Sequence, residues 1–132
     1  MDRLSERLTD AVRALASLQE LASRAARSTV ERDAAIMRFA YTFEAVWKAA
    51  QQLLDVAEGL DVGSPKQCVR AARRVGLLTD EQAEAALQMA DDRNLTVHVY
   101  REAVARDIDS RLSAHAATLA VWLAAMQRRH RA

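Results

Sequence analysis

Apolar residues recur at steps of three and four along three long stretches of the chain, which is the spacing of one face of an α-helix. The first stretch predicts a helix over roughly residues 3–27. Ser28-Thr29 then interrupts the pattern, and Thr29 is expected to cap the next helix. The second stripe is wider and contains Phe39, Phe43 and Trp47. Because aromatic side chains bury large areas, this helix should lie at the centre of the core.

Two shorter helices are predicted from their start and stop signals. Ser64 is a candidate N-cap, Pro65 fits the first helical position, and Gln67 completes a capping box. Gly76 is a typical residue just beyond a helix C-terminus. The segment 79–82 repeats the capping-box pattern and opens a further helix.

A last apolar stripe begins near Glu102 and continues almost to the end of the chain. The sequence therefore predicts an all-α, antiparallel up-and-down bundle of five helices, formed by one domain over residues 1–132. Many of the apolar positions are alanines, whose small side chains give the bundle a small core. Apolar faces that remain exposed favour a homodimer.

Composition agrees with this fold and narrows the classes of function. Only three glycines and one proline are present, too few for the turns of a β protein, and the net charge of +1 gives no global field that would attract nucleic acid. The single Cys68 excludes an intrachain disulfide or a thiolate zinc site. We find neither a signal peptide nor an apolar run of the ~20 residues that span a bilayer. A cytoplasmic protein without membrane contact is expected.

The segment 91–100 concentrates reactive side chains more than any other. Arg93, Asn94, His98 and Tyr100 place a cation, an amide, a group that titrates near neutrality and a phenol within eight residues. Arginine matches the geometry of phosphate, and histidine exchanges protons near pH 7, so the combination points to phosphodiester chemistry. The competing interpretation is that these are solvated or capping residues near a helix end.

No motif indicates a metal ion or a cofactor. The chain has no P-loop, no Gly-x-Gly-x-x-Gly and no His-Glu-x-x-His. Asp91-Asp92 are adjacent, so on a helix they diverge by about 100° and cannot hold one ion together. They are interpreted as neighbours of Arg93 or as solvated charges. His115 is interpreted as a partly buried helix residue rather than a catalyst.

A second basic feature lies in the segment 64–76, which has no acidic residue. Its cations are Lys66, Arg70, Arg73 and Arg74. A solvated helix face is the default interpretation, and a track for RNA phosphates is the alternative.

The spacing of Arg93 and His98 suggests how an active site could be assembled. On one continuous helix their directions differ by about 140°, which is unsuited to joint action. Either the helix ends before His98, or a twofold dimer sets Arg93 of one chain against His98 of the other.

The motif Arg93-Asn94-Leu-Thr-Val-His98-Val-Tyr100 resembles the HEPN superfamily, and specifically its HepT-like branch, also called the nucleotidyltransferase substrate-binding protein family. The similarity covers about residues 30–110 in order and spacing. Its further elements are Arg32-Asp33-Ala-Ala-Ile36, Phe39, Phe43, Trp47, Lys48, Ser64-Pro65 and Gly76-Leu77.

The resemblance implies a dimeric helical bundle that acts as a metal-independent endoribonuclease toxin, encoded beside a small nucleotidyltransferase antitoxin of the MntA type. Arg93 and His98 then match the ribonuclease residues, and Asn94 could orient His98 or a phosphate oxygen. Tyr100 resembles the acceptor that the partner adenylylates to silence the toxin. The family often has an acidic residue next, where this chain has Arg101, which bears on recognition of the partner.

Two other functions remain open at this point. One is a non-catalytic subunit that presents a nucleotide, or its own Tyr100, to a separate nucleotidyltransferase. The other is a helical dimer with no role in nucleic-acid chemistry. The presence of both Arg93 and His98 favours the ribonuclease, because a docking subunit has no need of the pair.

Overall fold

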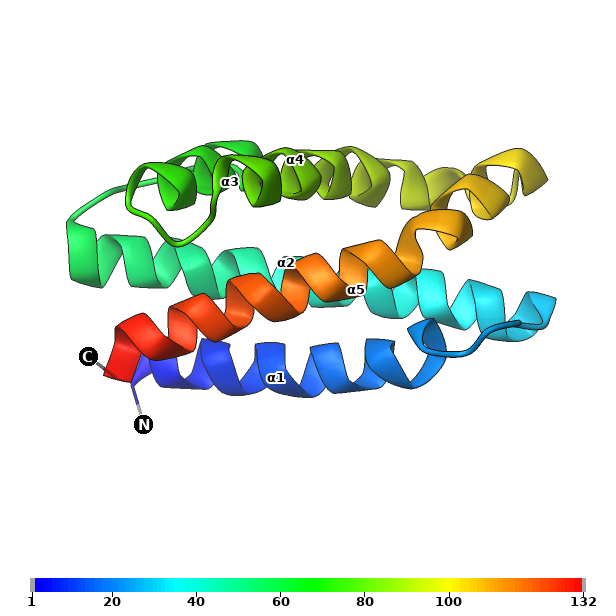
Figure 1. Ribbon diagram of the computed structural model, residues 1–132, viewed down its shortest axis with the longest axis horizontal. Coiled ribbons are helices and arrows are strands. Elements are labelled where there is room, and N and C mark those ends of the chain that lie inside the picture. The colour runs from blue at the N-terminus through cyan, green and yellow to red at the C-terminus, as the bar shows by residue number, and fades with distance from the viewer. Residues whose placement is uncertain (1, 132) are drawn as a thin grey trace.

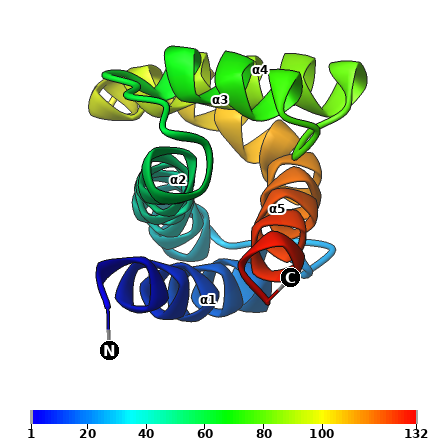
Figure 2. The same ribbon diagram turned by 90° about the vertical axis from the view of Figure 1, so that its left-hand side faces the viewer.

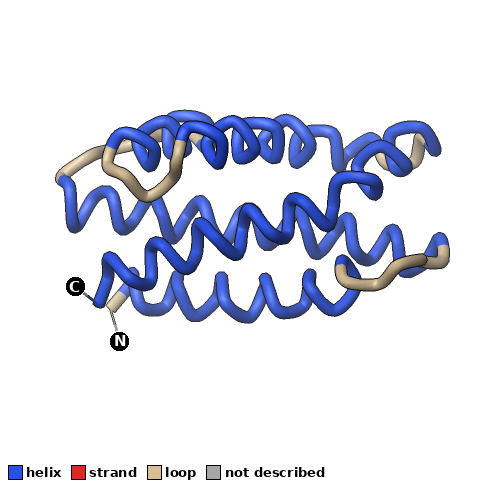
Figure 3. The backbone as a smooth tube through the Cα atoms, in the orientation of Figure 1, coloured by secondary structure: helices blue, strands red, loops and turns tan. Residues whose placement is uncertain are grey.

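The computed structural model describes residues 2–131, and all regular structure within them is helical (Figure 3). The elements are α1 (Arg3–Ala22), α2 (Thr29–Glu58), α3 (Pro65–Arg74), α4 (Asp80–Leu95), the short 3-10 helix η1 (Thr96–His98) and α5 (Glu102–Arg131). The predicted all-α fold with five α-helices is confirmed. Among these residues, no helix is long and apolar enough to cross a membrane.

The helices form three layers that run along the long axis of the molecule (Figure 1). Helices α2 and α5 make the middle layer, α1 packs against both of them on one side, and α3 and α4 cover the other side (Figure 2). The described chain begins and ends at the same end of the bundle, where Ser5 Oγ lies 3.4 Å from His130 Nε2. The opposite end holds the start of α2, the connection from α4 to α5, and η1 (Figure 1).

The predicted core residues occupy the middle of this arrangement. Phe39 and Phe43 of α2 are fully buried, and Trp47 is 8% exposed. Trp122 of α5 is also fully buried. Each large aromatic side chain removes an extensive apolar surface from water, so α2 becomes the central helix, as its stripe predicts.

The first helix is shorter than predicted, because it ends at Ala22 rather than near residue 27. Arg27 lies beyond this end and turns back, donating hydrogen bonds to the carbonyls of Leu21 and Arg24 at 3.1 and 3.3 Å. Its Nε also donates to Asp109 of α5 at 2.8 Å. The Arg27 side chain thus occupies carbonyls near the C-terminus of α1 that another helical turn would have used.

The helix starts agree with the sequence in two of three cases. Ser28, not Thr29, caps α2 and forms a reciprocal capping box with Glu31. Ser64 caps α3 as predicted, but the Gln67 side chain accepts from the Gly63 amide instead of closing the box on Ser64. The predicted box at the start of α4 is present in full. Gly76 has φ +83°, the left-handed conformation expected beyond the end of α3.

Candidate functional site

Arg93 lies in the last turn of α4 and lines a pocket of about 300 Å³ between α2, α3 and α4. The pocket is lined by Phe43, Glu44, Ser64, Pro65, Lys66, Ala90, Arg93 and Asn94. Arg93 Nη2 is 3.9 Å from Glu44 Oε1, which also accepts a hydrogen bond of 3.0 Å from Trp47 Nε1. Arg93 Nε is buried and has no hydrogen-bond partner among the described residues. The Nη end of the guanidinium is partly exposed and lies beyond hydrogen-bond distance of Glu44, so it can donate to a ligand in the pocket.

Three of the residues predicted from the sequence meet in this pocket, namely Lys66, Arg93 and Asn94. Lys66 comes from the first turn of α3, and its Nζ lies 2.7 Å from Asp91 Oδ1. Both cations are partly exposed. The arrangement offers two positive charges and an amide to a ligand that enters from solvent.

The other predicted cations do not join this group. Arg70 and Arg74 line a separate surface depression with Asp61, and Arg73 Nη1 lies 3.5 Å from Asp80 Oδ1. Of the four cations of residues 64–76, only Lys66 lines the Arg93 pocket, and contact of the other three with RNA phosphates stays a prediction.

His98 ends η1, so the α-helix stops at Leu95, before it reaches the histidine. The His98 side chain is exposed and does not line the Arg93 pocket. Tyr100 follows in the turn before α5 and is 79% exposed. Its hydroxyl is 3.5 Å from His98 Nδ1, and the two rings meet edge to face with centroids 6.0 Å apart. The expectation that Tyr100 is accessible to another enzyme agrees with this exposure.

Asp92 is neither solvated nor a partner of Arg93, which corrects the interpretation made from the sequence. Its side chain is fully buried and accepts hydrogen bonds from Arg111 Nε at 2.8 Å and Arg111 Nη2 at 2.9 Å. His115 Nε2 lies 2.6 Å from the same carboxylate, and the imidazole stacks on Phe39 with centroids 4.9 Å apart. We refer to Asp92, Arg111 and His115 as the buried charge cluster.

The buried charge cluster perturbs the ionisation of its members. Burial lowers the pKa of His115 more strongly than Asp92 raises it, so the imidazole is neutral at pH 7 and donates its Nε2–H. The pKa of Asp92 is lowered: desolvation opposes the charge, but hydrogen bonds from Arg111 and His115 outweigh it. The pKa of Arg111 is raised by its bond to Asp92. The cluster ties α4 to α5 one residue before Arg93.

Sequence reasoning missed this cluster, although one signal for it was present. His115 lies three residues after Leu112 and four before Leu119, so it occupies the apolar stripe of α5. A histidine at a core position requires a buried hydrogen-bond partner. The sequence could not indicate that this partner is Asp92.

Cys68 is the free cysteine of the chain, and it is completely buried. Its Sγ lies 3.5 Å from the carbonyl oxygen of Trp47. Burial raises the pKa of the thiol to about 12, so it is not a nucleophile at neutral pH.

Comparison with known proteins adds to this geometry. Residues 6–128 match the family model described as nucleotidyltransferase substrate binding protein like. A crystal structure of a protein from Thermus thermophilus is similar at 54% sequence identity and a TM-score of 0.86, and the match covers 88% of this chain and 98% of that one. No curated protein gives a significant match. The chain belongs to the nucleotidyltransferase substrate-binding protein-like family.

Proposed function

We propose that this protein is a HEPN-superfamily toxin of the HepT-like branch, a metal-independent endoribonuclease that a partner nucleotidyltransferase silences by modifying Tyr100. The observation that carries the proposal is the pairing of Arg93, whose guanidinium has unused donors at a pocket, with an exposed His98 five residues later. Family membership supports the link to a nucleotidyltransferase.

The proposed reaction uses the nucleophile that RNA itself carries. His98 acts as general base and removes the proton from a ribose 2′-hydroxyl, whose oxygen then attacks the adjacent phosphorus. The P–O5′ bond breaks, a proton is delivered to the leaving 5′-oxygen, and a 2′,3′-cyclic phosphate remains. Arg93 stabilises the negative charge that builds on the equatorial oxygens, and Asn94 orients a phosphate oxygen or His98.

We further propose a twofold homodimer in which Arg93 of one chain and His98 of the other act on the same phosphate. Within one chain, Arg93 faces the pocket with Glu44, whereas His98 projects from η1 outside it. Leu95 and Val97 come shortly before His98 in the chain and are 40% and 67% exposed. Apolar side chains exposed beside a candidate active site favour a surface that another chain covers.

Mixing two inactive variants tests the shared site. Arg93→Ala and His98→Ala are each expected to abolish cleavage of cellular RNA in chelator. If the two chains are unfolded together and refolded at equal amounts, half of the dimers are mixed and each has one intact site of two, so about one quarter of the parent activity returns. Recovery of no activity would mean that both residues act within one chain. Sedimentation showing a monomer at micromolar concentration would exclude the dimer.

Matched substitutions separate catalysis from folding. Arg106→Ala removes an exposed arginine that pairs with Glu102, and His130→Ala removes an exposed histidine at the other end of the bundle. Both controls should cleave RNA like the parent protein. If His98→Ala also cleaves at the parental rate, the proposed mechanism is wrong.

Modification of Tyr100 would place a negatively charged adenylate beside His98, where it repels RNA phosphate. Co-expression with the neighbouring nucleotidyltransferase, or incubation with it, ATP and Mg²⁺, should add one adenylate to Tyr100 and stop cleavage. Tyr41 is the matched control, because its hydroxyl is 2.6 Å from Ser17 Oγ and it is less exposed. Mass spectrometry that finds the adenylate on Tyr41, or none at all, would remove Tyr100 from the site.

The second candidate is a non-catalytic subunit that binds a nucleotide or other substrate for a nucleotidyltransferase. The description of the family favours it directly. This candidate requires no proton transfer, so His98→Ala should leave complex formation and substrate presentation intact. Metal-independent RNA cleavage that depends on His98 supports the first function, and its absence from the parent protein supports the second.

A further inference from the structure

We propose that the pocket between α2, α3 and α4 binds one guanine nucleotide unit, with its phosphate on Lys66 and Arg93 and its base on the carboxylate of Glu44. The assignment to RNA rests on the ribonuclease function proposed above. The pocket would also accept a free guanine nucleotide, because a free nucleotide and a nucleotide within RNA present the same base and a phosphate.

The lining of the pocket is divided in a way that suits a nucleotide. Pro65 is half-buried and provides apolar surface against which a base can lie, whereas Phe43 and Ala90 are buried behind the lining. Lys66 and Arg93 bring two positive charges, and Glu44 brings one negative charge. Asp91 does not line the pocket but pairs with Lys66, so a phosphate bound by both cations takes the place of this carboxylate. The polar groups come from three different helices, so their placement depends on the packed fold.

Both cations are available to a phosphate. Lys66 pairs with Asp91, but the two side chains are 43% and 55% exposed, and exposed pairs of this kind are weak. Lys66 can therefore exchange Asp91 for a phosphate oxygen. Arg93 Nη2 is 3.9 Å from Glu44 Oε1, beyond hydrogen-bond distance, and the side chain is partly exposed, so a phosphate oxygen can accept hydrogen bonds from this end of the guanidinium.

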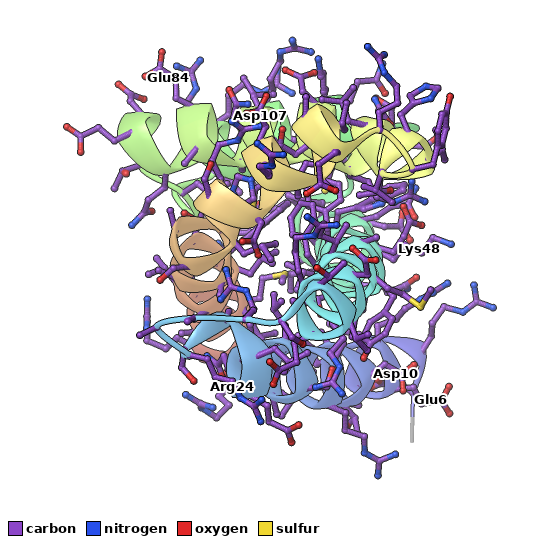
Figure 4. All side chains as sticks on the ribbon, turned by 90° about the vertical axis from the view of Figure 1, so that its right-hand side faces the viewer. Glu6, Asp10, Arg24, Lys48, Glu84 and Asp107 are labelled. Atoms are coloured by element: carbon purple, nitrogen blue, oxygen red, sulfur yellow. The ribbon has the colours of Figure 1, made fainter. Side chains whose placement is uncertain are left out.

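Glu44 supplies the selectivity for the base. The indole of Trp47 donates to Glu44 Oε1 at 3.0 Å and holds the carboxylate, while Lys48 Nζ lies 3.7 Å from Oε2. Lys48 itself extends outward from α2 (Figure 4). An ionised carboxylate only accepts hydrogen bonds, so it prefers a base edge with adjacent donors. Guanine offers N1–H and the 2-amino group side by side, whereas the other bases place an acceptor next to each donor on that edge.

Binding of mononucleotides tests the pocket without requiring cleavage. Two-dimensional NMR titrations of the full-length protein with 5′-GMP, 5′-AMP, 5′-CMP, 5′-UMP and inorganic phosphate should show the strongest binding for GMP, with shifts at Glu44, Lys66 and Asn94. Lys66→Ala should weaken every nucleotide by roughly tenfold, because it removes a charged phosphate contact. Arg74→Ala is the matched control, since this arginine lies on the same helix outside the pocket, and its binding should be unchanged.

Glu44→Gln separates base recognition from phosphate binding. Glutamine has nearly the same size but presents one acceptor and one donor group, so the preference for GMP over AMP should fall by roughly tenfold while phosphate affinity is kept or increased. Thermal unfolding of each variant verifies the fold. Equal binding of all four nucleotides by the parent protein, or an unchanged preference in Glu44→Gln, would overturn the proposal.

Cleavage mapping distinguishes a failure of this inference from a failure of the proposed function. If the parent protein binds GMP in the pocket but cleaves no RNA, the ribonuclease is wrong and the nucleotide site stands for a free nucleotide. If the parent protein cleaves RNA next to guanine and Glu44→Gln cleaves without this preference, the ribonuclease function and the guanine site are both supported. Cleavage without any guanine preference, together with absent GMP binding, would remove the pocket and retain the ribonuclease.

Discussion

Replacing Asp92 by alanine should destabilise the protein severely, although the residue is a charged side chain beside a predicted functional motif. The carboxylate is fully buried and is held by two hydrogen bonds from Arg111 and one contact of 2.6 Å with His115. Alanine would remove the only anion of this cluster, so Arg111 and His115 would both lose their hydrogen-bond acceptor. The stacked position of His115 on Phe39 prevents the imidazole from reaching water without disturbing the core.

The expected loss follows from the burial of each partner. Truncating one member of a buried ion pair typically costs about 3–5 kcal/mol. The Arg111 side chain is 35% exposed and can regain hydration, so we expect about 3 kcal/mol, the lower end of that range. For a domain of this size, about 3 kcal/mol corresponds to a decrease in Tm of roughly 10–15 °C. Asp92→Asn keeps the volume and one acceptor, and should lose about 1–3 kcal/mol.

The neighbouring Asp91 provides the matched control. It is 55% exposed and pairs with Lys66 at the surface, so Asp91→Ala should change the free energy of unfolding by at most about 1 kcal/mol. Urea denaturation followed by circular dichroism at pH 7.5 measures both variants under the same conditions. If Asp92→Ala and Asp91→Ala are equally stable, the buried charge cluster does not hold α4 against α5, and the reasoning from burial is refuted.

Three further predictions concern other features of the fold. The pKa of His115 is lowered from its ordinary value of 6.5, so the unfolded chain binds more protons than the folded one near and below that pH, and stability should fall as the pH decreases from 7.5 to 5. His115→Gln should flatten this pH dependence when the free energy of unfolding is measured by urea denaturation. An unchanged pH dependence in His115→Gln would show that His115 is not its source. Asp92 adds to the loss only near and below its ordinary pKa of 3.8, since its own pKa is lowered. Cys68 should react with a thiol reagent such as DTNB only at the rate of unfolding, and fast labelling of the native protein would contradict its burial. Gly76→Ala should lower the free energy of unfolding by about 1 kcal/mol, because φ at Gly76 is +83°. Gly63 lies outside the left-handed region and a Cβ there would make only an ordinary contact, so Gly63→Ala should lower it less. Equal Tm values for the two variants would show that the left-handed position carries no penalty.

The sequence by itself determined the features that depend on neighbouring residues. Apolar periodicity located the three long helices and the central place of Phe39 and Phe43, because a stripe every three to four residues must face a core. Capping signals located the starts of α3 and α4, since a cap acts within four residues. Two local expectations were wrong: Ser28 rather than Thr29 caps α2, and α1 ends at Ala22, five residues before Arg27 contacts Asp109 of α5.

Only the tertiary structure decided how distant charges combine. Lys66, Arg93 and Glu44 belong to three helices, and they share a pocket because α2, α3 and α4 pack together there. Asp92 and His115 are 23 residues apart, and neither has a local partner that predicts their contact. Short-range sequence patterns report the direction of a side chain relative to its own helix. The pairing of charges depends on how the helices are rotated and shifted against each other, which is set by the packing of the whole core.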